Sequence, residues 1–387
     1  MKFLHTADWH VGKTLHGRSR LDEQTRVLKE IVSLAIRHQV DAVLVAGDLY
    51  DNASPTAEAQ QLVVRTLMEL ARRDIEVIVI AGNHDHGRTL EAYRPLLAVA
   101  GIHVRGEARA ADDGGLHRFT ARSTGERCTV ALLPFLSQRW AVRASQIIAN
   151  TPSENVGAYD QQVRDIVTSL TAGFDPDGVN VIMAHLTCTG ALFGGGERQA
   201  QSILEYHVPA SIFPPETHYV ALGHLHRRQH VPAACPVHYS GSPFPVDFGE
   251  QENQHVVCLV EASPGVPAKV TDLPLTAGRR LRTVEGTVPQ LTVDPDAYGD
   301  DFLRVVVTQP AYAGLKDEIL EALPNALEVR IHPDHAATAP AAALAVDRAR
   351  RTPSELFADF CAERQFSDPQ VSALFDEISD ELSEGSR

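Results

Sequence analysis

Residues 81–86 read AGNHDH, and they directly follow residues 77–80, four apolar β-branched residues. A continuous apolar run of this kind predicts a strand that is buried on both faces. The strand would deliver an amide, an imidazole and a carboxylate, from Asn83, His84 and Asp85, into one short loop. Because such groups are costly to bury without partners, we expect this loop to belong to a functional site.

The same construction occurs at four other places. In each of them a short apolar run ends in Asp, His or both: HTADWH at 5–10, GDLYD at 47–51, His185 after 181–184, and GHLH at 223–226. In an open α/β sheet, ligands bind at the carboxyl ends of the strands, so five such ends can converge on one site. We interpret that site as a centre for two metal ions.

The expected ligands offer oxygen and nitrogen atoms, which suit hard divalent cations such as Mn²⁺ better than thiolates would. Asp48 is expected to bridge the two ions. One ion would also be held by Asp8, His10 and His226, and the other by Asn83, His185 and His224. We prefer His185 to His207 or His218 because only His185 ends an apolar strand.

Other polar residues of the motifs receive supporting roles. His84 is expected to face the substrate, where it would stabilise the transition state or protonate the leaving 3′ oxygen. Asp85 is expected to hydrogen-bond an imidazole from behind the ligands, and Asp51 to cap the next helix. Structural roles are expected for the remaining histidines that we considered, namely His5, His16, His38, His86, His103 and His117.

Taken in order, the motifs D-x-H, GD-x-x-D, GNHD, a single His and GHLH resemble those of the calcineurin-like metallophosphoesterases. Three stretches further resemble the nuclease subunits of bacterial complexes that contain an SMC-like ATPase: residues 5–24, 47–59 and 239–250. The likeness is strong over residues 1–273. It implies an α/β fold with a β-sandwich flanked by helices, and two Mn²⁺ ions, with Mg²⁺ as a substitute.

The resemblance also implies a function and partners. We expect a DNA nuclease that acts as a double-strand exonuclease and as an endonuclease on single strands and hairpins, in repair, recombination and replication. It would form a homodimer and bind the ATPase, and it would act in the bacterial cytoplasm, near the nucleoid. Residues 1–275 would form the nuclease domain, and residues 278–335 a small α+β domain that caps the DNA.

The composition agrees with a globular chain of this kind. The 387 residues carry a net charge of −15, so any DNA-binding face must be local. No apolar run approaches the roughly 18 residues of a membrane span, and the start does not resemble a signal peptide. The five scattered cysteines favour buried thiols in a reducing compartment.

The last part of the chain, residues 352–387, predicts helices that bind the ATPase partner. Apolar residues recur there at helical spacing, at Val371, Leu374, Phe375, Ile378 and Leu382, and acidic residues lie mostly off that stripe. A link rich in Ala and Pro separates these helices from the preceding domain. Packing of the helices against their own domain is the alternative.

Two other functions remain open at this stage. A phosphatase or phosphodiesterase that acts on phosphoproteins or nucleotides would use the same metals. A scaffold that has lost catalysis would need a broken ligand set, whereas this set is complete. Cleavage of a DNA hairpin rather than a nucleotide diester with Mn²⁺ would separate the three.

Overall fold

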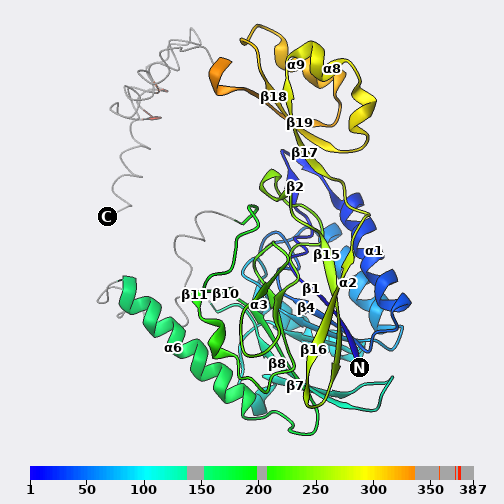
Figure 1. Ribbon diagram of the computed structural model, residues 1–387, viewed down its shortest axis with the longest axis vertical. Helices are drawn as coiled ribbons and strands as arrows, with labels where there is room; N and C mark the ends of the chain where they lie inside the picture. Colours follow the sequence, from blue (N-terminus) through cyan, green and yellow to red (C-terminus); the bar gives the residue numbers. More distant parts are fainter. Residues whose placement is uncertain (137–151, 198–206, 336–356, 358–370, 372–373, 376–387) are drawn as a thin grey trace.

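A computed structural model describes residues 1–136, 152–197, 207–335, 357, 371, 374 and 375 of the chain; for residues 152–158 it describes the backbone only. Two six-stranded sheets face each other in the larger part of the molecule (Figure 1). In spatial order, sheet one consists of β16 (Val266–Pro274), β15 (Val256–Ser263), β1 (Lys2–Thr6), β4 (Ala42–Ala46), β5 (Glu76–Ile80) and β6 (Ile102–Arg105). Sheet two consists of β13 (Gln229–Val231), β14 (Val237–Tyr239), β12 (Tyr219–Gly223), β9 (Val179–His185), β8 (Arg127–Leu133) and β7 (Leu116–Thr120).

The strands that precede the motifs are parallel within each sheet. In sheet one, β1, β4, β5 and β6 run parallel, and β15 and β16 pair antiparallel at one side. In sheet two, β8, β9, β12 and β14 run parallel, with β7 and β13 antiparallel at the two edges. Parallel strands place their carboxyl ends together, and this brings the motif loops to one end of the sandwich.

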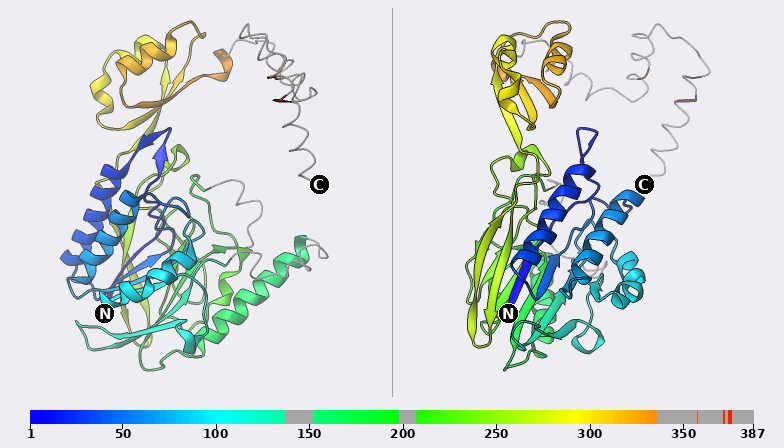
Figure 2. Two further views of the ribbon diagram at one scale, coloured as in Figure 1. Left: turned by 180° about the vertical axis from the view of Figure 1, so that it is seen from behind. Right: turned by 90° about the vertical axis from the view of Figure 1, so that its right-hand side faces the viewer.

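Helices cover the outer faces of both sheets. The helices α1 (Leu21–Arg37), α2 (Ala57–Ala71) and α3 (Gly87–Val99) flank sheet one, and α6 (Pro152–Thr171) packs on sheet two (Figure 2). All five residues of β4 are buried because alternate side chains face opposite layers. Leu44 points into the core between the sheets, whereas Val43 and Val45 pack under the helices.

A separate small unit follows the sandwich and lies at one end of the long axis (Figure 1). Its strands β17 (Leu281–Gly286), β18 (Phe302–Val307) and β19 (Ala326–Ile331) run parallel, and α8 (Val288–Thr292) and α9 (Leu315–Ala322) connect them. The unit has its own apolar cluster. A second cluster of Leu15, Phe248, Leu281 and Phe302 joins it to the sandwich.

Short elements complete the described chain. They are the ribbon of β2 (Thr14–Leu15) and β3 (Arg18–Ser19), the pair β10 (Thr187–Cys188) and β11 (His207–Val208), and five 3₁₀ turns, η1 (Ala111–Asp113), η2 (Ala210–Ile212), η3 (Phe248–Glu250), η4 (Pro295–Tyr298) and η5 (Pro333–His335). Residues 241–243 form no strand: Gly241 has a φ of +74° and begins an irregular loop.

Two further findings concern the helices and the cysteines. Among the described residues, no helix is long and apolar enough to cross a membrane. Cys128, Cys188, Cys235 and Cys258 are free and buried, and burial raises the pKa of each thiol. Most of the tail predicted at residues 352–387 lies outside the described residues, as does Cys361.

Candidate metal centre

The five motif loops meet, but they come from two sheets. The sequence interpretation arranged them along one open sheet, whereas β1, β4 and β5 belong to sheet one and β9 and β12 to sheet two. The loops after β1 and β4 run side by side, because the Asp8 N–H donates to the Gly47 carbonyl and the His10 N–H to the Asp48 carbonyl, both at 3.0 Å. The candidate site therefore lies where the carboxyl ends of both sheets converge.

The first group of side chains consists of Asp8, His10 and His226. They are buried, and one potential ligand atom from each lies within 4.8 Å of the others. Asp8 Oδ1 accepts the His224 N–H at 2.9 Å, but Asp8 Oδ2 is buried without a hydrogen-bond partner among the described residues. His10 Nε2 faces His226 Nε2 at 3.0 Å. A cation would satisfy both the orphaned oxygen and these converging ring nitrogens.

The second group consists of Asp48, His185 and His224, and Asn83 joins it. One ligand atom from each of the first three lies within 4.8 Å of the others. The Asn83 Oδ1 is 2.9 Å from His185 Nε2 and 2.7 Å from His224 Nδ1. His185 Nδ1 donates to the Ala46 carbonyl at 2.8 Å, which leaves the Nε2 lone pair directed at the site.

Asp48 lies between the two groups. Its Oδ2 is 3.4 Å from His185 Nε2 and 3.7 Å from His10 Nε2, and its Oδ1 accepts the His84 N–H at 2.8 Å. Burial opposes ionisation of Asp48, but His185 and the other nearby imidazoles hold its pKa well below the usual range. Burial likewise opposes the charge of His185, but Asp48 raises the pKa of His185 to about 9. The site therefore attracts positive charge.

The backbone of the site is fitted closely around these side chains. A Cβ on Gly47, whose φ is +96°, would lie 2.2 Å from His185 Nδ1, and a Cβ on Gly82 would lie 2.1 Å from Asp48 Oδ1. Asp8, His10, Asp48 and His224 themselves have positive φ, between 42° and 103°. Such backbone is uncommon outside glycine and clusters at functional sites.

Glu250 is a residue that the sequence analysis left without a role. It is fully buried, and its Oε1 accepts a hydrogen bond from His226 Nδ1 at 2.5 Å. The other oxygen accepts from Ser242 Oγ and the Val246 N–H, both at 3.0 Å. Burial opposes the charge of His226, but Glu250 raises the pKa of that imidazole to about 10. Asp247 and Glu252 lie close to it in the chain, so no local pattern distinguished Glu250.

Two supporting roles that we predicted from the sequence are wrong. Asp85 was expected to bind an imidazole, but its carboxylate accepts the backbone N–H groups of Leu49, Tyr50 and Gly82 at 2.9–3.2 Å. Without Asp85 these three buried N–H groups would have no acceptor, so their demand for hydrogen bonds, rather than an imidazole, decides the orientation of the Asp85 carboxylate. Asp51 was expected to cap α2, but the cap is Thr56, which accepts the Ala59 N–H. Asp51 instead lies 3.1 Å from Lys13 Nζ.

His84 lies at the edge of the two groups and is partly buried. Its Nδ1 donates to the Asp51 carbonyl at 2.7 Å, so its Nε2 is left for chemistry. One of its ring nitrogens also lies within 4.8 Å of ligand atoms of His10 and Asp48. The geometry therefore permits either a substrate-facing role or a ligand role.

Most of the histidines that were expected to be structural have partners away from the centre. His5 is buried against the Tyr219 hydroxyl at 2.9 Å, and His86 caps α3 by accepting the Thr89 N–H. His218, which we rejected as a ligand, lies with Nδ1 3.0 Å from the Asn180 backbone N and Nε2 3.0 Å from the Gly265 backbone N, and it can accept from one of the two. His103 and His117 lie together with Glu76 at the opposite end of the sandwich.

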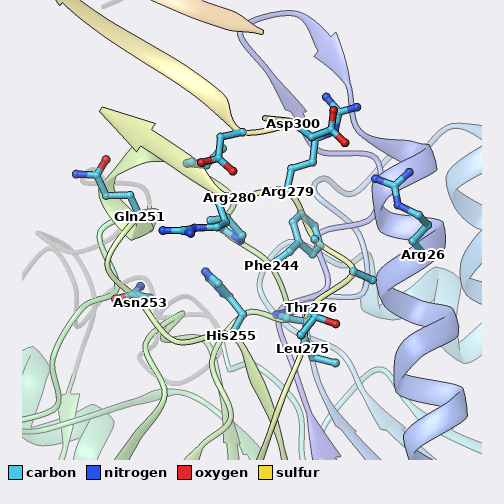
Figure 3. A pocket seen from close by; sticks show the side chains of 16 residues that line it. Arg26, Phe244, Gln251, Asn253, His255, Leu275, Thr276, Arg279, Arg280 and Asp300 are labelled. Carbon is cyan, nitrogen blue, oxygen red and sulfur yellow. The ribbon is translucent and has the colours of Figure 1, made fainter. Parts of the chain in front are cut away.

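A cavity of about 820 Å³ opens between the sandwich and the small unit. Three arginines line it, Arg26 from α1 and Arg279 and Arg280 from the segment before β17, and Arg280 extends across the cavity above His255 (Figure 3). Asp300 and Asp301 also line the cavity. The described surface therefore has a local group of cations, despite the overall charge of −15.

Comparisons with known proteins agree with this architecture. Residues 1–228 match the family model of the calcineurin-like phosphoesterases. Residues 277–365 match a model described as the type 5 capsule protein repressor C-terminal domain. The SbcD subunit of the SbcCD nuclease of Bacillus subtilis is 36% identical over 73% of this chain and 71% of its own length. That of Rhodobacter capsulatus is 33% identical over 92% of this chain and 94% of its own, and that of Escherichia coli K12 is 28% identical over 86% and 84%.

These matches cover the sandwich, and two of the relatives are at least 33% identical over most of both chains. Family membership and the two groups of buried donors together imply the use of divalent metal ions. The assignment of each ligand stays a prediction. The chain belongs to the calcineurin-like phosphoesterases and, within that family, to the SbcD nuclease subunits.

Proposed function

We propose that the chain hydrolyses phosphodiester bonds in DNA, with two divalent ions, as the nuclease subunit of an SbcCD complex. The observation that carries the proposal is the convergence of seven oxygen and nitrogen donors from five strand ends. It would act as an exonuclease on double strands and as an endonuclease on single strands and hairpins. Repair, recombination and replication at the nucleoid are the settings that this activity suits.

Mn²⁺ is the ion that we propose, with Mg²⁺ as a substitute, because carboxylate, amide and imidazole ligands suit it. Asp48 would bridge the ions. Asp8, His10 and His226 would complete one site, and Asn83, His185 and His224 the other. The orphaned Asp8 Oδ2 and the facing ring nitrogens of His10 and His226 support this fit. When bound, the two ions would polarise the phosphate and lower the pKa of an attacking water.

His84 would act on the leaving group. Donation from its Nδ1 to the Asp51 carbonyl fixes the ring, so that a proton held on Nε2 can pass to the departing 3′ oxygen. Asp85 would hold the loop rather than a ligand, since it binds three backbone N–H groups around Asp48 and Asn83. Asp85 would therefore position the loop, His84 would protonate the leaving group, and the seven ligands would hold the ions.

Residues 1–275 would form the nuclease domain, and residues 278–335 would cap the DNA. The arginine-lined cavity at the junction supports this role, because Arg280 is exposed and Arg279 lies 4.8 Å over the Phe302 ring. Guanidinium groups bind phosphates without reading sequence, so contacts here would hold the duplex in register. Binding through such contacts would weaken steeply as salt is raised.

A homodimer would bring two active sites to one DNA. Support comes from α3, where Leu90 is the one buried residue and Tyr93, Leu96 and Val99 are 44%, 73% and 90% exposed. An exposed apolar stripe of this kind is typical of a protein interface. Leu96→Asp with Val99→Asp should therefore give a monomer in sedimentation at tens of micromolar. A monomeric wild-type chain under the same conditions would contradict the dimer.

The tail would bind the SMC-like ATPase SbcC, for which the name of the relatives' complex is support. In the described part of the tail, Val371 and Leu374 are 37% and 54% exposed, and Phe357 stacks on Phe375 with ring centroids 4.0 Å apart. Apolar anchors at this spacing suit helix-in-groove docking. Deletion of residues 352–387 should preserve Mn²⁺-dependent cutting of single strands and abolish ATP-stimulated cutting. Undiminished copurification of the truncated chain with SbcC would contradict this.

The test of the function uses matched substrates. Purified chain with Mn²⁺ should open a labelled DNA hairpin and degrade duplex ends much faster than it hydrolyses a cyclic nucleotide or a phosphopeptide. The Asp8→Asn variant serves as the inactive control. Preference for the small diester or the phosphopeptide would instead favour a nucleotide phosphodiesterase or a phosphatase. Failure on every substrate, in a chain that binds the ions, would favour a scaffold.

A further inference from the structure

Glu76, His103 and His117 form a compact cluster that the nuclease activity does not use. Glu76 begins β5, His103 lies in β6, and His117 lies in β7 of the facing sheet. The five residues of β5 span roughly 17 Å, and Asn83 follows the opposite end of that strand. The cluster is therefore separate from the candidate metal centre.

The sheet register directs all three side chains into the same space. His103 pairs with Ile78, which faces the core between the sheets, and Glu76 lies on that face two residues earlier. His117 pairs with Val130, which belongs to the same core. The cluster thus closes the edge of the sandwich where β5 and β6 face β7.

The three ligand atoms converge. Glu76 Oε1 lies 2.9 Å from His103 Nε2 and 2.7 Å from His117 Nε2, and the two rings lie against each other with centroids 3.7 Å apart and planes tilted by 32°. Ligand atoms on a tetrahedral ion at about 2.0–2.1 Å are roughly 3.3 Å apart. Small side-chain rotations would therefore admit an ion in place of the two N–H protons.

The surroundings suit an ion that is exchanged with solvent. The side chains of His103, Glu76 and His117 are 36%, 26% and 16% exposed, so an ion can enter and a water can complete its shell. Two imidazoles and one carboxylate, with one open position, are a ligand set of Zn²⁺. Mg²⁺ and Mn²⁺ prefer sites with more oxygen ligands; each ion of the candidate metal centre would have two residues that offer oxygen, whereas this cluster has only Glu76.

We propose that Glu76, His103 and His117 form a third metal site, selective for Zn²⁺ over Mn²⁺, which links the two sheets at the open edge of the sandwich. The ion would bind both Nε2 atoms and the Glu76 carboxylate. Each imidazole would bind the ion through Nε2 and keep one proton, on Nδ1, so a neutral ring changes its tautomer and releases no net proton.

The test measures bound Zn²⁺ per chain by equilibrium dialysis and elemental analysis of the full-length protein. Wild type should hold one more Zn²⁺ than Glu76→Gln and than His117→Asn. The control is His230→Asn, since the His230 ring also lies close to that of another histidine, His238, with centroids 4.8 Å apart, but His238 Nδ1 faces the Arg228 guanidinium. His230→Asn should bind as many ions as wild type.

A second measurement separates a bound ion from a folding defect. Zn²⁺ should raise the Tm of wild type and His230→Asn more than that of Glu76→Gln or His117→Asn, and far-ultraviolet circular dichroism should show all four chains folded. With Mn²⁺ alone, wild type and Glu76→Gln should bind the same number of ions. Equal Zn²⁺ counts in wild type and in both cluster variants would overturn the proposal, as would an equal gain in Tm.

Discussion

Glu250→Gln should weaken metal binding at the centre although Glu250 is not expected to touch the ions. The carboxylate accepts from His226 Nδ1 on one oxygen and from Ser242 Oγ and the Val246 N–H on the other. A glutamine of the same volume has only one accepting oxygen. If that oxygen faces Val246, the amide NH₂ meets His226 Nδ1 and forces the ring proton onto Nε2. The lone pair that we expect to bind the metal is then lost.

The size of the effect follows from this change of tautomer. Loss of the carboxylate behind a ligating imidazole typically lowers metal affinity 10–100-fold, or about 1.4–2.7 kcal/mol. The proton balance also changes. Because Glu250 raises the pKa of His226 to about 10 against burial, metal binding at neutral pH must displace a proton from that ring in wild type. In Glu250→Gln, burial without the carboxylate lowers the pKa of His226, so metal binding should release about one proton fewer than in wild type.

The assay is titration calorimetry with Mn²⁺ in buffers of different ionisation enthalpy, which yields both affinity and proton release. Saturating Mn²⁺ should restore hairpin cleavage in Glu250→Gln, at a higher half-maximal concentration. The control is Glu197→Gln, because Glu197 accepts the backbone N–H of His226 at 2.9 Å rather than the ring N–H. Wild-type affinity and proton release in Glu250→Gln, or the same losses in Glu197→Gln, would refute the reasoning.

Three further predictions concern single residues. His84→Ala should lower cleavage by a factor of about 10²–10⁴ and keep both ions, as measured by calorimetry, because its proposed role is proton transfer; loss of ions would make it a ligand. Asp48→Ala should reduce ion occupancy more than His226→Ala does, because it leaves the two ions without a bridge; two ions retained in a crystal structure would exclude that role. Burial opposes ionisation of Glu76, but hydrogen bonds from His103 and His117 lower the pKa of Glu76 to about 2. The ionised carboxylate therefore stabilises the folded chain above the unfolded pKa near 4.5, and this stabilisation is lost as pH falls toward 2. With a discount for the partial exposure of Glu76, the stabilisation is about 1–2 kcal/mol, so the free energy of unfolding in urea should differ between wild type and Glu76→Gln more at pH 7 than at pH 4. An equal difference at both pH values would contradict this prediction.

The strands and their motif loops could be predicted because their signal is local. A β-branched run such as residues 77–80 indicates a buried strand wherever it pairs. The sheet to which each strand belongs could not be predicted, because a strand that is buried on both faces has the same apolar sequence pattern in either sheet. Only the pairing of β9 with β8 and β12, rather than with β4, places His185 opposite Asp48.

The errors on Asp85 and Glu250 share one physical cause: each carboxylate binds hydrogen-bond donors that are distant in the sequence or belong to the backbone. Asp85 was assigned to an imidazole because the sequence does not show that three N–H groups at Leu49, Tyr50 and Gly82 converge on it. Glu250 was left without a role because His226, 24 residues earlier, approaches it only after β13 and β14 turn the chain back. Short-range patterns carry no information on either contact.

The connection from Glu250 to the small unit gives that unit a part in the centre itself. Glu250 ends η3, and the next residue, Gln251, accepts from both the N–H and the hydroxyl of Thr283 in β17, at 3.0 and 2.8 Å. Phe248, at the start of η3, packs with Leu281 and Phe302 of the same unit. A carboxylate that fixes the His226 ring thus lies on a turn held at both ends by the small unit. Because a buried hydrogen bond weakens steeply as its geometry is lost, a shift of that unit against the sandwich would move Glu250 and reorient His226.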